Sequence, residues 1–247
     1  MRLPTPVANE LASRVLAQGV ERGVLPAADL PDWDRFLALR SVVRERFDVP
    51  ETSITPLMAR ILYGIALVVR PRRVLGIGTY AANALVWLLA PGFSPQRVYE
   101  GERAVGVDPD VAASELARRN LDSVGVERVE LRSEDGHATP AALGERWDLV
   151  LLDADDPVVR KGIYLTLLDA VYPFVSAGGL VLAHDICVPR FRSDMERYQG
   201  AVRDPERFDR TLPLEVDDCG LEVSVKRRPR PRPAEAAPLG CRVCGLP

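Results

Sequence analysis

The sequence has little of several residue types and patterns, and each shortage excludes a class of protein. The longest apolar run, residues 61–69, is about half of the ~20 residues that a membrane-spanning helix needs. The first residues contain no apolar segment typical of a secretory signal. The four cysteines form no dense disulfide framework, and a chain of 247 residues does not need one. We therefore expect a reduced, cytoplasmic protein that makes no contact with a membrane.

Excess charge of either sign is also absent. The formal net charge is −3, with 32 basic and 35 acidic side chains. A general nucleic-acid binder needs clustered positive charge to displace counterions, so this balance argues against a nucleic-acid partner. Apolar residues make up 47% of the chain, which is enough for a sizeable core. The composition leaves the binding of small molecules open.

Three parts follow one another along the chain. Residues 1–52 show helical, amphipathic periodicity over 8–20 and 31–47, which predicts an N-terminal helical cap. Residues 53–228 are predicted to form the main domain, which opens with a helix capped by Thr55. Residues 229–247 are rich in proline, arginine and alanine, which predicts a mobile tail. Cys241 and Cys244 form a lone C-x-x-C pair there, and a zinc site is the alternative to a simple tail.

Short apolar runs alternate with helical stretches in the main domain. The predicted strands are 73–78, 104–107, 129–131, 149–152 and 180–183, and the predicted helices between them are 82–89, 109–121 and 163–174. Two further strand-like runs, 210–216 and 221–226, indicate a closing hairpin. This order predicts an α/β fold with a doubly wound, mostly parallel seven-stranded sheet, a C-terminal antiparallel hairpin and N-terminal helices.

A glycine-rich turn follows the first predicted strand. Gly78 allows the chain to turn tightly and allows a ligand to approach the backbone. About 30 residues later Asp108 ends the next strand, where its carboxylate can accept hydrogen bonds from two ribose hydroxyls. NAD-binding and S-adenosylmethionine-binding sheets share these features, and a glycine turn without a ligand is a third interpretation. The closing hairpin and the long spacing to Asp108, beyond the ~20 residues usual for NAD, disfavour an NAD-dependent oxidoreductase.

Four motifs occur in an order that resembles one enzyme family. Residues 74–85, which include Tyr80, are similar to the first motif of the catechol and caffeoyl-CoA O-methyltransferases, V-L-E-x-G-x-[FY]-x-G-Y-S-x. Residues 147–155 resemble F-D-L-x-F-x-D-A-D, residues 178–185 resemble G-G-x-x-x-x-D-N, and residues 218–221 resemble the D-G-L of a closing hairpin. The resemblance spans roughly residues 54–228. It implies a class I S-adenosylmethionine-dependent methyltransferase, and we also expect a homodimer.

The resemblance implies a cofactor site along the ends of the first strands. The chain departs from the family pattern where Gly76 replaces a glutamate, Ala82 a glycine and Ala84 a serine that helps hold the methionine carboxylate. Asn83 can substitute for that serine, because an amide both donates and accepts hydrogen bonds. His137 is expected to line the adenine pocket or to be exposed. The candidate cofactor-binding residues are Gly76, Gly78, Tyr80, Ala82, Asn83, Asp108, Pro109, Asp135, Gly136, His137 and Asp153.

Polar side chains end two strands that should be neighbours. Asp153 follows one of them, and His184 and Asp185 end the other. The matching family positions hold Mg²⁺, whereas imidazole with carboxylates better suits Fe, Mn or Zn. Three uses are open: a divalent-metal site, a metal-free site with His184 as general base, and a structural pair of strand ends.

A lysine directly follows the D-A-D motif in the family, but here that position is Asp156. Lys161 either reaches into the cluster or is a solvated residue at a helix start, and the second is the simpler expectation. The candidate catalytic residues are His184, Asp153 and Lys161. The sequence thus predicts S-adenosylmethionine-dependent O-methylation of a small molecule. The alternatives are a non-methylating use of the cofactor, such as cyclisation, and a non-catalytic methyltransferase-like binding protein.

Overall fold

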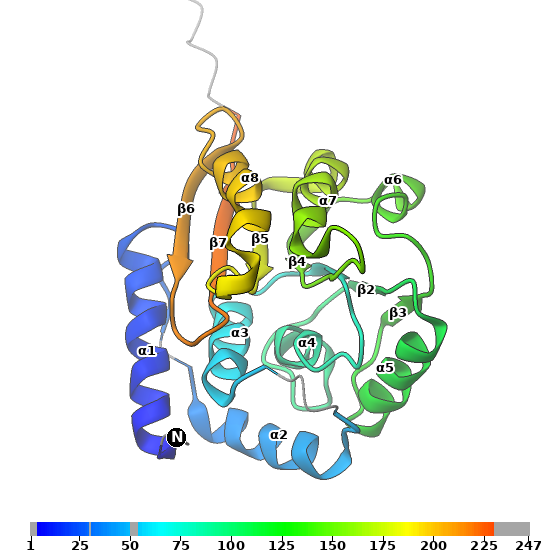
Figure 1. Cartoon of the computed structure of the whole chain (residues 1–247). Coiled ribbons are helices and arrows are strands. Elements are labelled where there is room, and N and C mark those ends of the chain that lie inside the picture. The colour runs from blue at the N-terminus through cyan, green and yellow to red at the C-terminus, as the bar shows by residue number, and fades with distance from the viewer. Residues whose placement is uncertain (1–3, 30, 50–53, 230–247) are drawn as a thin grey trace, which may run out of the picture.

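A seven-stranded sheet with the order β3-β2-β1-β4-β5-β7-β6 forms the centre of the computed structural model, which describes residues 4–29, 31–49 and 54–229 (Figure 1). The first five strands are parallel, whereas β7 runs antiparallel to both β5 and β6. This topology confirms the predicted sheet and its closing hairpin. The strands are β1 (Arg73–Ile77), β2 (Arg103–Val107), β3 (Val129–Arg132), β4 (Trp147–Leu152), β5 (Val175–His184), β6 (Phe208–Leu214) and β7 (Leu221–Lys226).

Helices cover both faces of the sheet. Successive residues of a strand point to opposite faces, so Leu149 and Leu151 of β4 pack in one core while Val150 and Leu152 pack in the other. The first core is shared with α1 (Thr5–Glu21), α2 (Trp33–Arg46), α3 (Pro56–Val69), α4 (Leu85–Phe93) and α5 (Val111–Ser123). The second is shared with α7 (Ile163–Val171) and α8 (Arg192–Val202), and the short α6 (Thr139–Leu143) contacts α7.

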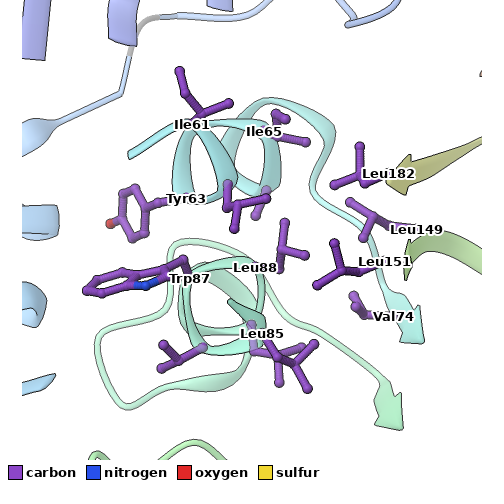
Figure 2. Packing of buried hydrophobic residues seen from close by; sticks show 14 of the residues in the cluster. Ile61, Tyr63, Ile65, Val74, Leu85, Trp87, Leu88, Leu149, Leu151 and Leu182 are labelled. Atoms are coloured by element: carbon purple, nitrogen blue, oxygen red, sulfur yellow. The ribbon is translucent and has the colours of Figure 1, made fainter. Parts of the chain in front are cut away.

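The first core is centred on α3 and α4, which lie side by side against the sheet (Figure 2). Ile61 and Ile65 of α3 and Leu88 of α4 are fully buried there. Phe36 of α2 joins this core from outside, with its ring centroid 5.3 Å from that of Tyr63 and 5.2 Å from that of Trp87. The N-terminal helices therefore share a hydrophobic core with the main domain.

Two of the helix boundaries that differ from those expected have a clear structural cause. The helix expected at 82–89 begins only at Leu85, because Tyr80 and Ala82 have φ values of 42° and 60°, in the left-handed region that a right-handed helix excludes. The helix expected at 163–174 ends at Val171 and continues as a 3₁₀ turn over Tyr172–Phe174, which contains Pro173. Thr55 caps α3 as expected, since its hydroxyl accepts a hydrogen bond from the Met58 backbone.

Helices α6 and α8 had no counterpart in the expected element order. None of the helices in the described ranges is long and apolar enough to cross a membrane. The expected tail, including Cys241 and Cys244, lies outside the described residues apart from its first position.

Candidate active site

The turn after β1 is held against the ends of both neighbouring strands. The backbone of Gly78 donates to the carbonyl of Val107 at 2.9 Å, and the backbone of Asp153 donates to the carbonyl of Ile77 at 2.9 Å. Gly78 has a φ of 85°, and a Cβ at this position would lie 2.4 Å from the backbone nitrogen of Ala154. Only glycine fits, because the end of β4 approaches the turn so closely. The turn and Asp153 are therefore fixed relative to each other.

Asp108 ends β2 beside this turn. Its Oδ2 accepts a hydrogen bond from the Tyr80 backbone at 2.8 Å, and its Oδ1 accepts one from the Asp110 backbone at 3.0 Å. Each carboxylate oxygen can accept a further bond, so the group can hold ribose hydroxyls while it orders the turn. The Tyr80 side chain is 47% exposed, Ala82 is fully buried, and Pro109 is exposed. Both oxygens of the carboxylate thus keep capacity for a further hydrogen bond beside the turn.

The space beside Gly76 is already filled. A Cβ at Gly76 would lie 3.0 Å from Cδ1 of Leu85, so the first residue of α4 packs against the strand at the position where the family has a glutamate. Asn83, half-buried in the same turn, lines a cavity of about 450 Å³ together with Arg40, Arg44 and Trp87. The departure at Gly76 is accommodated by an apolar contact, and two arginines line the cavity beside Asn83.

Asp135 and His137 follow β3 and are bonded to each other. Oδ1 of Asp135 accepts from the His137 backbone at 2.9 Å and lies 2.8 Å from Nδ1 of the ring. The backbone hydrogen bond from His137 holds the pKa of Asp135 below its ordinary value. Nε2 of His137 lies 2.8 Å from the hydroxyl of Thr166, and Gly136 between the two is buried. The His137 ring is thus held by Asp135 and Thr166, apart from the cluster at the ends of β4 and β5.

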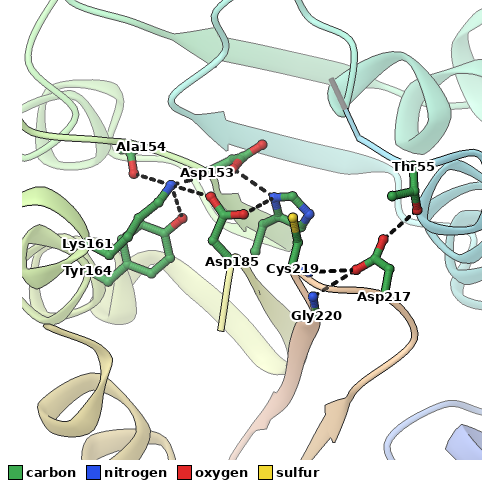
Figure 3. Close-up of polar contacts among 10 residues, drawn as sticks. Thr55, Asp153, Ala154, Lys161, Tyr164, Asp185, Asp217, Cys219 and Gly220 are labelled. Atoms are coloured by element: carbon green, nitrogen blue, oxygen red, sulfur yellow. Dashed lines mark hydrogen bonds and ion pairs between the residues drawn. The ribbon is translucent and has the colours of Figure 1, made fainter. Parts of the chain in front are cut away.

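Asp153, His184 and Asp185 converge at the paired ends of β4 and β5, as the sequence predicts (Figure 3). Nδ1 of His184 lies 3.2 Å from Oδ1 of Asp153 and 3.4 Å from Oδ1 of Asp185. The ring is 6% exposed, and its Nε2 is buried with no hydrogen-bond partner among the described residues. A buried imidazole nitrogen without a partner is costly and needs an explanation, and a catalytic role is one.

The charges of the cluster alter its protonation equilibria. Burial acts to lower the pKa of His184, but the carboxylates of Asp153, Asp185 and Asp217 outweigh it and raise that pKa above its ordinary value. Burial acts to raise the pKa of Asp185, but His184 and Lys161 outweigh it and lower that pKa. Asp185 also has a φ of 64°, a strained conformation found often at functional sites.

Lys161 points into the cluster, so the expectation of a solvated side chain was wrong. Its side chain is 4% exposed, and Nζ lies 2.9 Å from Oδ2 of Asp185 and 3.9 Å from Oδ1 of Asp153. Nζ also donates to the carbonyl of Ala154 at 2.9 Å and to the hydroxyl of Tyr164 at 3.2 Å. Four acceptors from three segments therefore surround one buried ammonium (Figure 3).

Asp156, at the position of the family's lysine, explains how Lys161 reaches inward. Its Oδ1 accepts hydrogen bonds from the backbones of Val158 and Val159 at 2.8 and 2.7 Å, and these bonds close a turn. A 3₁₀ turn over Arg160–Gly162 follows it. Arg160 points outward to an ion pair with Asp194 at 2.9 Å, and the next residue points inward.

Cys219 is a neighbour of the cluster that the sequence motifs did not single out. Possible ligand atoms of His184, Asp185 and Cys219 lie within 4.8 Å of one another. Burial, and then Asp185, raise the pKa of the Cys219 thiol to about 12, so the thiol is protonated at neutral pH in this arrangement. Asp185 is already paired with the ammonium of Lys161, whose positive charge would repel a divalent cation at this point. The cluster in this arrangement does not fit a divalent metal.

The loop between β6 and β7 ties the cluster to α3. Oδ1 of Asp217 accepts from the backbones of Cys219 and Gly220 at 3.1 and 2.9 Å, which fixes the loop. The hydroxyl of Thr55, which caps α3, donates to Oδ2 of the same aspartate (Figure 3). The start of α3 therefore lies against the loop that carries Cys219.

Comparisons with known proteins found similarity to methyltransferases. The chain is 32% identical over 124 residues to the catechol O-methyltransferase of Mycobacterium tuberculosis, a match that covers 49% of this chain and 54% of that protein. The chain thus matches about half the length of this curated relative. No family model matches the chain.

Solved structures match over most of the chain. An O-methyltransferase of Bacillus cereus in complex with S-adenosylhomocysteine has a TM-score of 0.61 and 17% identity, over 89% of this chain and all of that one. A methyltransferase of Geobacter sulfurreducens has a TM-score of 0.56 and 25% identity, over 87% of this chain and 96% of that one. The chain therefore has the fold of the class I S-adenosylmethionine-dependent methyltransferases and resembles the catechol and caffeoyl-CoA O-methyltransferases in sequence.

Proposed function

We propose that this chain is an S-adenosylmethionine-dependent O-methyltransferase that acts on a small molecule. The position of Asp153 carries the proposal. Its backbone is held against the turn of Gly78, which with Asp108 suits a nucleoside cofactor, while its side chain holds His184. One residue thus connects the cofactor turn to a candidate base, and a methyl donor and an acceptor hydroxyl would meet beside it.

His184 is the proposed general base. Because Nδ1 donates to Asp153 when the ring is neutral, Nε2 is left as an acceptor for a proton, and the carboxylate fixes both tautomer and orientation. S-adenosylmethionine would supply the methyl group on a sulfonium. Nε2 would take the proton of the acceptor hydroxyl, and Asp153 and Asp185 would stabilise the resulting imidazolium. We propose that the cluster acts without a metal, because the ammonium of Lys161 is already paired with Asp185.

The cavity beside Asn83 bears on the substrate. Two arginines, Arg40 and Arg44, line it together with Trp87, whose indole nitrogen is buried and has no hydrogen-bond partner among the described residues. Thr55 also lines this cavity and contacts the loop beside His184. Two arginines that line one space favour a carboxylate, so we propose a hydroxy acid over a neutral substrate.

The domain division, the oligomeric state and the location of the protein are also proposals. We propose that residues 1–52 cap the substrate side, that residues 53–228 form the methyltransferase domain, and that the protein is a cytoplasmic homodimer without a nucleic-acid partner. Light scattering of the purified protein measures its oligomeric state directly.

The test is product formation without added metal. The protein is incubated with S-adenosylmethionine, EDTA and a panel of phenols and hydroxy acids, and S-adenosylhomocysteine and methylated products are measured by mass spectrometry. With at least one hydroxy acid we expect S-adenosylhomocysteine and the methylated product in equal amounts. With the His184→Gln variant we expect neither product. A changed substrate without S-adenosylhomocysteine would indicate the cyclisation-type alternative. Absence of cofactor binding together with a stable partner would indicate a binding protein.

A further inference from the structure

The buried ammonium of Lys161 has no spare hydrogen-bonding capacity. A lysine has three N–H donors, and three acceptors lie within hydrogen-bond distance: Oδ2 of Asp185 and the carbonyl of Ala154, both at 2.9 Å, and the hydroxyl of Tyr164 at 3.2 Å. The nitrogen would have a lone pair only if the ammonium lost a proton, and with it one of these hydrogen bonds. Lys161 is therefore badly placed to take a proton from a substrate or to donate to one.

The same ammonium lies where a cation is needed electrostatically. Asp153 and Asp185 are both partly buried, and their carboxylates both lie near Nζ of Lys161. A positive charge at this position reduces the repulsion between the two carboxylates. Nδ1 of His184 lies within 3.4 Å of both carboxylates, and Nζ of Lys161 lies within 3.9 Å of both. The aromatic rings of Tyr164 and Phe191 lie 5.2 and 5.7 Å from Nζ, which adds favourable contact for a cation.

We propose that the Lys161 ammonium is a permanent replacement for a divalent cation between Asp153 and Asp185, so that the cluster works without a metal. Lys161 is then a positioning residue: it holds the two carboxylates in place, and Asp153 in turn orients His184. This inference deepens the proposed function, since it assigns the electrostatics of the same site. It concerns cation binding, which is measured separately from methyl transfer.

Removal of the lysine should convert the cluster into a metal site. Lys161→Met keeps the length of the side chain and removes its charge, which leaves two carboxylates, an imidazole and a thiol facing one space. The probe is Mn²⁺, followed by electron paramagnetic resonance and by the melting temperature. We expect no saturable binding to the wild type and saturable binding to the variant, at least about tenfold tighter than the weakest binding that the titration can detect, accompanied by a rise in melting temperature.

Lys226→Met is the matched control. Lys226 is also partly buried, but its Nζ donates to the carbonyls of Tyr172 and Val175 at 2.7 and 2.9 Å, and no carboxylate is among these partners. Its replacement should lower stability without creating Mn²⁺ binding. Binding by both variants would show a nonspecific effect of lost positive charge and would overturn the proposal.

The wild-type protein provides a second test that does not depend on the variant's folding. Its melting temperature should stay unchanged on addition of EDTA or of Mn²⁺. Saturable Mn²⁺ binding by the wild type, or a folded Lys161→Met protein that gains none, would overturn the proposal. A protein that binds no metal but also fails to transfer methyl groups would refute the proposed function and leave this inference standing.

Discussion

Asp153 and His184 are bonded through Oδ1 and Nδ1 at 3.2 Å, and this bond leaves Nε2 of the imidazole buried and without a partner among the described residues. The arrangement resembles the carboxylate–imidazole half of a hydrolytic triad, in which one ring nitrogen is oriented and the other takes a proton. It differs in having a second carboxylate, Asp185, and an ammonium, Lys161, beside it.

The pH dependence of methyl transfer should report His184. Because the neighbouring carboxylates raise the pKa of His184, the reactive neutral form is populated only above the ordinary histidine range, so the rate should rise with pH through that raised value. Asp153→Asn removes one of these carboxylates and should move the midpoint to lower pH, as measured from rates with saturating substrates. A midpoint that stays in place or moves upward would show that another group is titrating.

Thr55 should contribute to stability through two hydrogen bonds. Its hydroxyl caps α3 by accepting from the Met58 backbone and donates to Asp217 in the β6–β7 loop. Thr55→Val keeps the shape and removes both, which should lower the free energy of unfolding by about 1–3 kcal/mol. Thr55→Ser, which keeps the hydroxyl, is the control and should cost less. A loss of stability in urea denaturation for Thr55→Ser but not for Thr55→Val would locate the effect in the methyl group instead.

Glu222 should make stability fall as pH rises. Its side chain is fully buried on β7, and burial raises its pKa although Arg203 and Thr211 oppose the shift. A carboxyl whose folded-state pKa is raised contributes stability below its unfolded-state pKa, and that contribution is lost as pH rises through the folded-state value. Glu222→Gln should therefore melt higher than the wild type at pH 8, with a smaller difference at pH 5. A variant that melts lower than the wild type by the same amount at both pH values would contradict the predicted direction of this pH effect.

The sequence predicted the sheet because its signals are local. Unbroken apolar strands such as 149–152 are buried on both faces, and Thr55 and Pro56 mark the start of α3 by their own chemistry. The motif order also placed Asp153 and His184 at neighbouring strand ends, which the pairing of β4 with β5 confirms.

The parts that the sequence did not predict depend on contacts between distant segments. Lys161 resembles a helix-start residue in isolation, and its inward direction depends on the turn that Asp156 closes and on carboxylates from two strands. Cys219 joins the cluster only because β7 pairs with β5. The late start of α4 results from the backbone conformations of Tyr80 and Ala82, which no pattern of apolar residues encodes.

Calorimetry with S-adenosylhomocysteine measures binding at the cofactor site proposed for the turn of Gly78. The wild type should bind one molecule per chain. Asp108→Ala should weaken binding at least about tenfold, because the ribose loses hydrogen bonds to a charged group and the turn loses its bond at Tyr80. Asp122→Ala, an exposed position on α5, is the control and should bind as the wild type does. Absence of binding by the wild type, or equal binding by Asp108→Ala, would contradict the account.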